Sequence, residues 1–270
     1  MHLRGDMAYT TFIYEIKDGI ATIRLNDPAK LNALTFQTYE ELERLFANLA
    51  RDDLVKVVVI TGAGKGFCSG GSVHEIIGKL MDYNGEELHR FTRMTCDVVR
   101  NMRNLKKPII AAVNGMAAGA GAMLALASDL RIVSDRAKFA FLFTKVGLSG
   151  ADMGALYLLP RTVGQGKATE LLFLGEVVDA QEAHRIGLAN RVVDHKTLMD
   201  EAYELAKRLK ASPLYALGVT KELMEKEANV NLAEALDIES AAQARCMQTP
   251  DFEEGYRAFL EKRAPVFNKS

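Results

Sequence analysis

The chain has 270 residues, of which 49% are hydrophobic, and its formal net charge is −1. This length and apolar content allow one large domain with a sizeable core, and the near-neutral charge excludes nucleic acid as the main partner. The three cysteines are scattered, the N-terminus has no apolar signal segment, and no apolar run is long enough to span a bilayer. We therefore expect a cytoplasmic protein with no membrane partner.

Patterning along the first half of the chain predicts alternating strands and helices. Two short alternating runs, 12–16 and 20–25, flank the pair Asp18-Gly19 and predict a β-hairpin. Apolar residues at helical spacing, from Tyr39 to Leu49, predict a helix that begins after Thr35. This alternation is typical of an α/β fold with parallel strands. Further buried strands are predicted over 55–61, 108–113 and 130–133, and a further helix over about 85–105.

The last third of the chain is predicted to be mainly helical. Amphipathic spacing predicts helices over about 164–174, 180–186, 198–211, 214–228, 232–245 and 252–262. No repeat or Gly/Ser-rich linker separates these segments. We divide the chain into an N-terminal segment outside the fold (1–10), a core domain (11–195), and a helical C-terminal region (196–270) packed on the core or on a neighbouring subunit.

Two glycine-rich segments, residues 62–72 and residues 114–121, follow predicted strands and give the clearest chemical signal. Neither fits the phosphate-loop, dinucleotide-binding or G-x-S-x-G pattern. Each is compatible with a simple tight turn, which glycine always permits. Two such segments at successive strand ends, the second leading into a helix, instead favour a pair of backbone N–H donors that bind an oxyanion.

The order of these segments resembles the crotonase (enoyl-CoA hydratase/isomerase) superfamily. The resemblance rests on residues 57–71 and 107–121, on 26–34 and on 258–265, and it spans roughly residues 11–267. It implies a crotonase-like spiral of ββα units with a helical C-terminal trimerisation region, assembled as a homotrimer or homohexamer. It also implies an acyl-CoA thioester as substrate, with coenzyme A as part of that substrate and no separate cofactor or metal.

The resemblance assigns the oxyanion hole to the N–H groups of Gly71 and Ala120, which would stabilise the enolate oxygen of the thioester. It also places the two glutamates of a typical hydratase at Met123 and at Phe143 or Thr144, so this chain lacks both. Hydration needs a general base for water and an acid for the α-carbon. The usual two-glutamate mechanism is therefore not expected here.

One carboxylate remains in this part of the chain, Asp152. Its apolar and glycine neighbours are expected to raise its pKa toward a range useful for proton transfer. Asp152 is equally suited to cap a helix that starts just after it. The segment 143–161 most resembles the 1,2-epoxyphenylacetyl-CoA isomerase-like members, in which an aspartate of this loop is catalytic, and this implies a catalytic Asp152. Dehalogenation is not expected, because Phe143 stands where the dehalogenase members need a tryptophan.

Further side chains beside these loops, or in matching family segments, are assigned to substrate binding: Lys30, Ser69, Ser72, Val73, His74, Met123, Phe143, Phe259 and Lys262. Simpler structural roles stay open for several of them. These are solvated surface positions for His74, Lys30 and Lys262, and core positions for Met123 and Phe259.

Three functions fit these features. The first is an enoyl-CoA hydratase/isomerase family enzyme in which Gly71 and Ala120 hold the thioester oxygen while Asp152 moves a proton, giving isomerisation or a non-standard addition or elimination. The second is a conventional enoyl-CoA hydratase of fatty-acid or aromatic-acid degradation. The third is a catalytically inactive homologue that binds acyl-CoA. We favour an enzyme because Asp152 remains.

Overall fold

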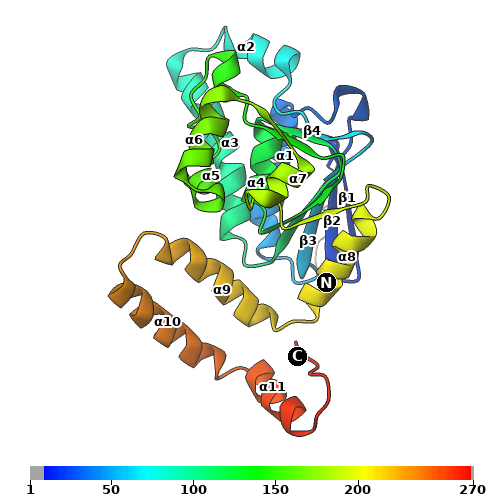
Figure 1. Cartoon of the computed structure of the whole chain (residues 1–270), viewed down its shortest axis with the longest axis vertical. Helices are drawn as coiled ribbons and strands as arrows, with labels where there is room; N and C mark the ends of the chain where they lie inside the picture. The colour runs from blue at the N-terminus through cyan, green and yellow to red at the C-terminus, as the bar shows by residue number, and fades with distance from the viewer. Residues whose placement is uncertain (1–8, 269–270) are drawn as a thin grey trace, which may run out of the picture.

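The computed structural model describes residues 9–268, and two β-sheets form its centre (Figure 1). The larger sheet has six strands in the order β1-β2-β3-β5-β7-β10, and the smaller has four in the order β4-β6-β8-β9. The strands of the larger sheet are β1 (Phe12–Lys17), β2 (Ile20–Leu25), β3 (Val57–Gly62), β5 (Ile109–Val113), β7 (Leu130–Ser134) and β10 (Arg191–Val193). Those of the smaller sheet are β4 (Gly66–Cys68), β6 (Met116–Ala118), β8 (Lys138–Ala140) and β9 (Val177–Asp179).

The direction of the strands follows the α/β pattern that the sequence predicts. β1 and β2 form the predicted antiparallel hairpin, and every other pair in the larger sheet is parallel. The chain passes from the larger to the smaller sheet three times, at β3-β4, β5-β6 and β7-β8, and helical structure follows each pair. This is the spiral of ββα units that the resemblance implies.

Helices surround the two sheets: α1 (Phe36–Leu49), α2 (Gly78–Leu80), α3 (Gly85–Asn104), α4 (Ala120–Ala127), α5 (Ala155–Val163), α6 (Gln165–Leu174), α7 (Ala180–Arg185) and α8 (Leu198–Lys210). Short 3-10 or π turns span Pro28–Lys30, Val73–Ile77 and Phe143–Val146. α1 begins where the sequence predicts because the Thr35 hydroxyl accepts a hydrogen bond from the Thr38 N–H.

Alternate residues of the larger sheet pack against different helices. Val57 and Val59 are buried against α8, while Val58 and Ile60 belong to the main core with apolar residues of α1, α3 and α4. This alternation follows from the two-residue repeat of a β-strand. α8, which we predicted as the first helix of the C-terminal region, therefore covers one face of the sheet.

The three-residue strands β4, β6, β8, β9 and β10 were not predicted. β4 and β6 lie inside the two glycine-rich segments, where Gly and Ala provide no alternation of β-branched and polar residues. The second segment therefore does not lead directly from strand to helix, as the sequence suggested, because β6 lies between β5 and α4.

Tyr9 and Thr10, which were expected outside the fold, are packed against it. The Tyr9 ring stacks on Phe12 with their centroids 4.9 Å apart, and the Thr10 hydroxyl donates a 2.9 Å hydrogen bond to Glu41. The same prediction for residues 1–8 concerns a segment outside the described residues.

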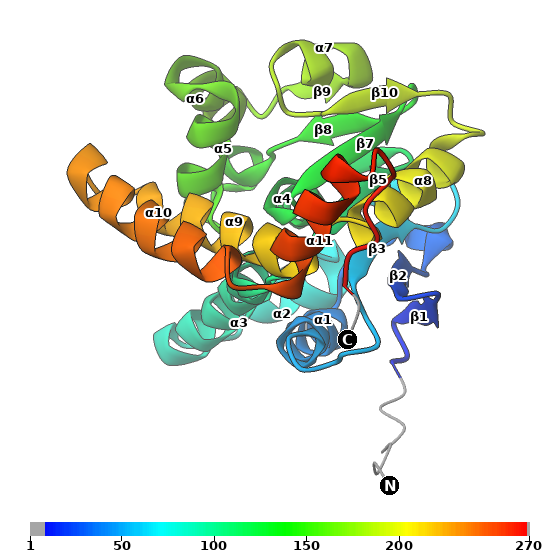
Figure 2. The same ribbon diagram turned by 90° about the horizontal axis from the view of Figure 1, so that it is seen from below.

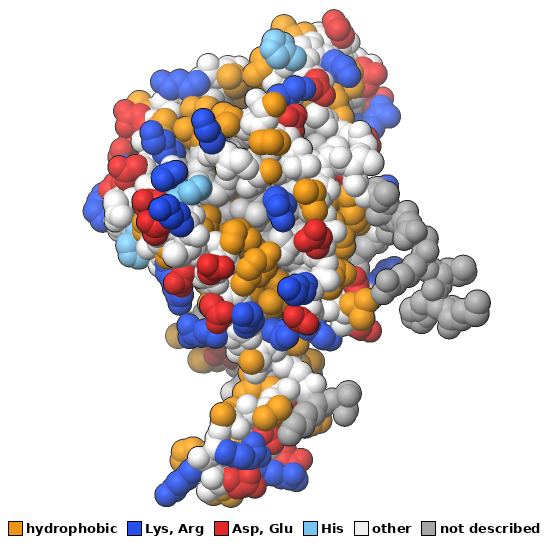
Figure 3. All heavy atoms as spheres, turned by 90° about the vertical axis from the view of Figure 1, so that its right-hand side faces the viewer, with side chains coloured by type: hydrophobic (Ala, Val, Ile, Leu, Met, Phe, Trp, Pro, Cys, Tyr) orange, Lys and Arg blue, Asp and Glu red, His pale blue; other side chains and the backbone are white. Residues whose placement is uncertain are grey.

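The last three helices, α9 (Leu214–Glu227), α10 (Leu232–Cys246) and α11 (Pro250–Leu260), form a separate arm below the sheets (Figures 1 and 2). In Figure 3 the arm is the smaller lobe below the larger one. Its surface has hydrophobic side chains between charged ones. Lys221 of α9 joins the arm to the core through a 2.8 Å hydrogen bond from its Nζ to Asp129 Oδ2. None of the described helices combines the length and the apolar character that crossing a membrane requires.

Candidate active site

The first glycine loop (62–72) and the second glycine loop (114–121) lie directly against each other. A Cβ atom on Gly115 would come within 1.9 Å of a backbone oxygen of the first loop, and one on Gly121 within 2.1 Å of the Cys68 oxygen. Atoms cannot approach this closely, so any side chain at either position would push the loops apart. Glycine is needed at both positions for close backbone contact.

Two buried asparagines, Asn32 and Asn114, fasten the first loop. Both donate from Nδ2 to the Gly66 carbonyl oxygen, at 2.8 and 3.0 Å respectively. Asn114 Oδ1 also accepts a 3.2 Å hydrogen bond from the Gly62 N–H. Neither asparagine was assigned a role from the sequence, because their partners lie 34 to 52 residues away along the chain and become neighbours only in the fold.

Two backbone N–H groups without a protein partner lie where the loops meet. α4 begins at Ala120 without a side-chain cap, after Gly119 at φ +50°. Within residues 9–268, no backbone or side-chain group accepts a hydrogen bond from the N–H of Ala120 or of Gly71. A Cβ on Gly70 would lie 3.6 Å from the Ala120 nitrogen, so the first loop passes close to the start of α4. Free N–H groups at a helix start suit an anionic oxygen.

Asp152 lies in the turn before α5, and its partial burial raises the pKa of its carboxyl above the ordinary aspartate value. The N-cap of α5 is Gly154, and no side chain caps the helix, so the alternative role of Asp152 as a helix cap is wrong. Met153, between these two residues, has φ +46°. This conformation is uncommon for a residue with a side chain and occurs often near functional sites.

Tyr39 lies beside the first loop. Its oxygen lies 3.9 Å from the position that a Cβ on Gly71 would occupy. Burial, followed by the charges of Cys68 and Asp152, raises the pKa of the Tyr39 hydroxyl well above its usual value. Burial also raises the pKa of the Cys68 thiol to about 12, so this residue stays protonated and is a poor nucleophile. The sequence placed Tyr39 in the apolar stripe of α1, and its hydroxyl was the signal that we missed.

Three of the predicted binding residues are linked beside the first loop, directly or through Glu75. Lys30 is exposed and pairs with Glu75 at 2.6 Å, and Ser69 Oγ donates a 3.2 Å hydrogen bond to the Lys30 oxygen. Ser72 Oγ accepts a 3.2 Å hydrogen bond from the Glu75 N–H and so caps the next turn. Two more predicted residues are exposed on that turn: Val73 and His74.

Met123 and Phe143 are both buried in the main core, at 0% and 5% exposure. Thr144, the alternative to Phe143, donates its hydroxyl to the Phe173 oxygen at 3.0 Å. The positions that the resemblance assigns to hydratase glutamates therefore carry apolar side chains, or a hydroxyl that already has a backbone partner.

Phe259 and Lys262 lie in the C-terminal arm, and both are exposed. The arm's α11 is at the opposite end of the molecule from β4 of the first loop (Figure 1). Within one chain, the structure does not bring these two predicted residues to the glycine loops.

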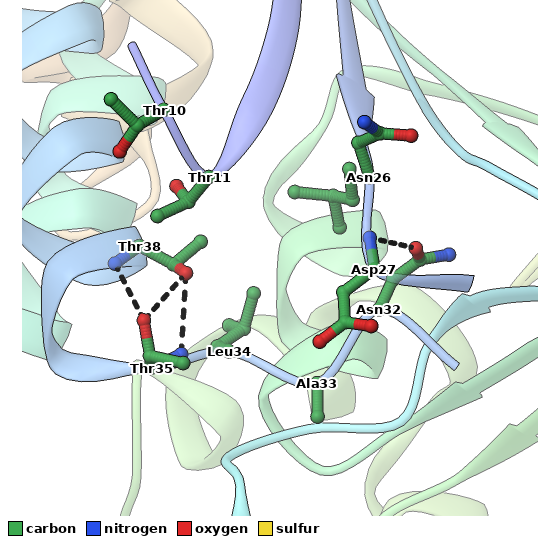
Figure 4. Close-up of a pocket in the computed structure, with 10 residues that line it drawn as sticks. Thr10, Thr11, Asn26, Asp27, Asn32, Ala33, Leu34, Thr35 and Thr38 are labelled. Atoms are coloured by element: carbon green, nitrogen blue, oxygen red, sulfur yellow. Dashed lines mark hydrogen bonds between the residues drawn. The ribbon is translucent and has the colours of Figure 1, made fainter. Parts of the chain in front are cut away.

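A separate polar cavity of 230 Å³ lies between the end of β2 and the start of α1 (Figure 4). None of the predicted catalytic residues lines it. Two of its hydroxyls, those of Thr35 and Thr38, are already used in capping α1. Among residues 9–268, no cluster of three His, Cys, Asp or Glu side chains is placed to hold a metal ion. The cavity is lined by Thr10, Thr11, Leu25, Asn26, Asp27, Asn32, Ala33, Leu34, Thr35 and Thr38.

Known proteins match this chain along nearly its whole length. A model of the enoyl-CoA hydratase/isomerase family matches residues 15–270. The chain is 38% identical to the 1,2-epoxyphenylacetyl-CoA isomerase of Escherichia coli (strain K12), over 93% of this chain and 96% of that protein. It is 34% identical to the crotonyl-CoA hydratase of Syntrophomonas wolfei, over 97% and 99%. A crystal structure of a Streptomyces coelicolor A3(2) protein, assigned as an enoyl-CoA hydratase, matches with a TM-score of 0.95 at 47% identity, over 97% of this chain and 95% of that one.

Proposed function

Because the chain belongs to the enoyl-CoA hydratase/isomerase family, we propose that it isomerises an acyl-CoA thioester through an enolate. The N–H groups of Gly71 and Ala120 bind the thioester oxygen, and Asp152 carries the proton. The observation that supports this most strongly is the pair of N–H groups of Gly71 and Ala120, which have no partner among residues 9–268 and lie where the two glycine loops meet.

The proposed chemistry is a proton shuttle. Ionised Asp152 takes a proton from one carbon of the acyl group, and the electron pair of the broken C–H bond moves into an enolate. The two N–H donors stabilise the enolate oxygen, each by about 3 kcal/mol in the transition state. Protonated Asp152 exchanges its proton with solvent in the intermediate and then protonates a different carbon, which moves the double bond. Its raised pKa suits both steps, because it makes the carboxylate a stronger base. These steps use groups of this chain alone, and we propose no cofactor besides the coenzyme A moiety of the substrate.

Conventional hydration is the second candidate, and the name of the crotonyl-CoA hydratase relative favours it. The burial of Met123 and Phe143 argues against it, because neither side chain can activate water or protonate the α-carbon. A protein that only binds acyl-CoA is the third candidate, and Asp152 argues against that one.

Mass spectrometry of acyl-CoA products formed in deuterated water separates these candidates. We expect a 3-enoyl-CoA to be converted into its 2-enoyl isomer with deuterium incorporated, and crotonyl-CoA to be hydrated slowly or not at all. Rapid gain of one water by crotonyl-CoA would instead support a hydratase. Binding of both thioesters with neither deuterium exchange nor hydration would support the non-catalytic candidate.

We also propose that the chain assembles as a homotrimer or homohexamer through its C-terminal arm. The arm exposes large apolar side chains, among them Leu232 at 75% and Phe259 at 80% exposure, and such residues are commonly covered at subunit contacts. Light scattering is expected to give a mass of three or six times the 29.7 kDa of one chain. A monomeric mass would contradict this assembly.

A further inference from the structure

The hydroxyl of Tyr39 is a buried polar group without a partner. Tyr39 is 3% exposed, and its ring meets Phe91 edge to face with their centroids 5.9 Å apart. Among the described residues, none forms a hydrogen bond with the Tyr39 oxygen. A buried tyrosine usually has such a partner, since an unpaired polar group in the interior loses its hydrogen bonds to water without replacement. The hydroxyl therefore contributes no hydrogen bond to the described fold.

The hydroxyl faces the catalytic loops. Its oxygen is 3.9 Å from the point where a Cβ on Gly71 would stand, so it lies within a few bond lengths of the Gly71 N–H. The Tyr39 oxygen is not one of the unpaired polar atoms that the protein encloses completely. It therefore borders space that solvent can reach. Burial raises the pKa of the hydroxyl well above its usual value. Tyr39 is accordingly a neutral O–H donor over the pH range in which proteins work.

We propose that the Tyr39 hydroxyl donates a hydrogen bond to an oxygen atom on the acyl group of the substrate. This residue would then select thioesters with an epoxide, hydroxyl or keto oxygen close to the thioester carbonyl over hydrocarbon acyl chains. The inference rests on the proposed function, since it uses the same acyl-CoA site.

An oxygen of the acyl chain is a better partner than the thioester oxygen itself. The thioester oxygen is already assigned the N–H groups of Gly71 and Ala120, and a carbonyl oxygen has two lone pairs to share. Hydrocarbon chains offer no acceptor, so they would leave the hydroxyl buried and unpaired in the complex. Sites built to hydrogen-bond a substrate group reject analogues that lack it for this reason.

Calorimetric binding of two matched thioesters tests the proposal without any turnover. Phenylacetyl-CoA and 2-hydroxyphenylacetyl-CoA share a skeleton and differ by one oxygen. For Tyr39→Phe, we expect affinity for the hydroxylated thioester to fall about 10-fold and affinity for phenylacetyl-CoA to change less than about two-fold. Tyr14→Phe is the control, because it removes a partly buried hydroxyl on β1. This control is expected to leave both affinities unchanged.

The other outcomes are equally informative. Equal loss of affinity for both thioesters would indicate a third oxyanion donor or a structural role, and unchanged affinity for both would remove Tyr39 from the site. Either result overturns this proposal and leaves the proposed function standing. If the wild-type protein binds neither thioester, both are overturned. Because Phe deletes an unpaired hydroxyl, Tyr39→Phe should also unfold at or above the wild-type temperature, and a clearly lower value would show that the fold uses this hydroxyl.

Discussion

At Asp152, the physical environment favours the protonated carboxyl, and the proposed chemistry requires the ionised one. Partial burial raises the pKa of this carboxyl, and the N–H of Met153 opposes that shift only in part. The side chain caps no helix, because Gly154 holds the N-cap of α5. A charged group kept in such a position without a structural task is typical of an active site.

The pH dependence of kcat/KM is expected to follow this raised pKa. The ionised carboxylate is the base, so activity should fall as the pH drops through the folded pKa of Asp152, and this decline should begin above the ordinary aspartate range. Stability changes in the opposite sense: between the unfolded and the higher folded pKa the folded state holds more protons, so the contribution of Asp152 to the unfolding free energy falls as the pH rises. A kcat/KM that stays constant down to the pKa of an ordinary aspartate would contradict the assignment of this base.

At the level of elements, the long periodic segments could be predicted from the sequence and the short ones could not. β3 is a continuous apolar run and α1 carries a clear helical repeat, and both were found within about two residues. β4 and β6 are three-residue strands in glycine-rich loops, and their pairing depends on close backbone contact between distant segments. The two glycine loops could be found because strand-end glycines are a local pattern, whereas Gly71 and Ala120 within them were assigned by the family resemblance and stay predictions. Tyr39 was missed because it stands in the apolar stripe of α1, where it reads as a core residue.

Two glycine substitutions distinguish the contribution of loop packing to stability from the contribution of Gly71 to acyl-CoA binding. Gly121→Ala places a methyl group 2.1 Å from the Cys68 oxygen, and we expect it to lower the unfolding free energy by about 3 kcal/mol or more. Gly71→Ala meets only ordinary contacts at 3.8 and 3.9 Å, so its stability should stay near wild type. Its methyl group points toward the Tyr39 hydroxyl, and acyl-CoA binding should weaken. Urea unfolding and calorimetric binding measure the two effects, and equal stability of the two variants would refute the described loop packing.

At the scale of the whole molecule, the C-terminal arm depends on a small number of polar contacts with the core. Lys221 Nζ donates to Asp129 Oδ2 at 2.8 Å and to the Met102 oxygen at 3.1 Å, and burial lowers the pKa of this lysine. Arg103 of α3 pairs with Glu225, which lies on α9 as Lys221 does. The sequence predicted the helices of the arm but not its attachment, because charged residues at these positions look like a solvated helix face.

Lys221→Met is expected to lower the unfolding free energy by about 2 kcal/mol, since it leaves Asp129 partly buried with a weaker set of partners. The matched control is Lys226→Met on the same helix. Lys226 pairs with Glu222 on the surface, and its loss should cost less than about 0.5 kcal/mol. Denaturant titration measures both, and equal effects of the two substitutions would rule out a role for Lys221 in holding the arm.

The central claim is that Asp152 moves the proton while the loops hold the thioester, and Asp152→Asn tests it most directly. Deuterium exchange into a bound acyl-CoA should slow by about 1,000-fold, because general bases contribute on that order. Affinity for the thioester and the unfolding temperature should stay at or above the wild-type level, since Asn removes the cost of a partly buried charge. The exposed Asp53→Asn serves as the control and should change neither rate nor affinity. A folded Asp152→Asn protein that exchanges deuterium at the wild-type rate would contradict the account.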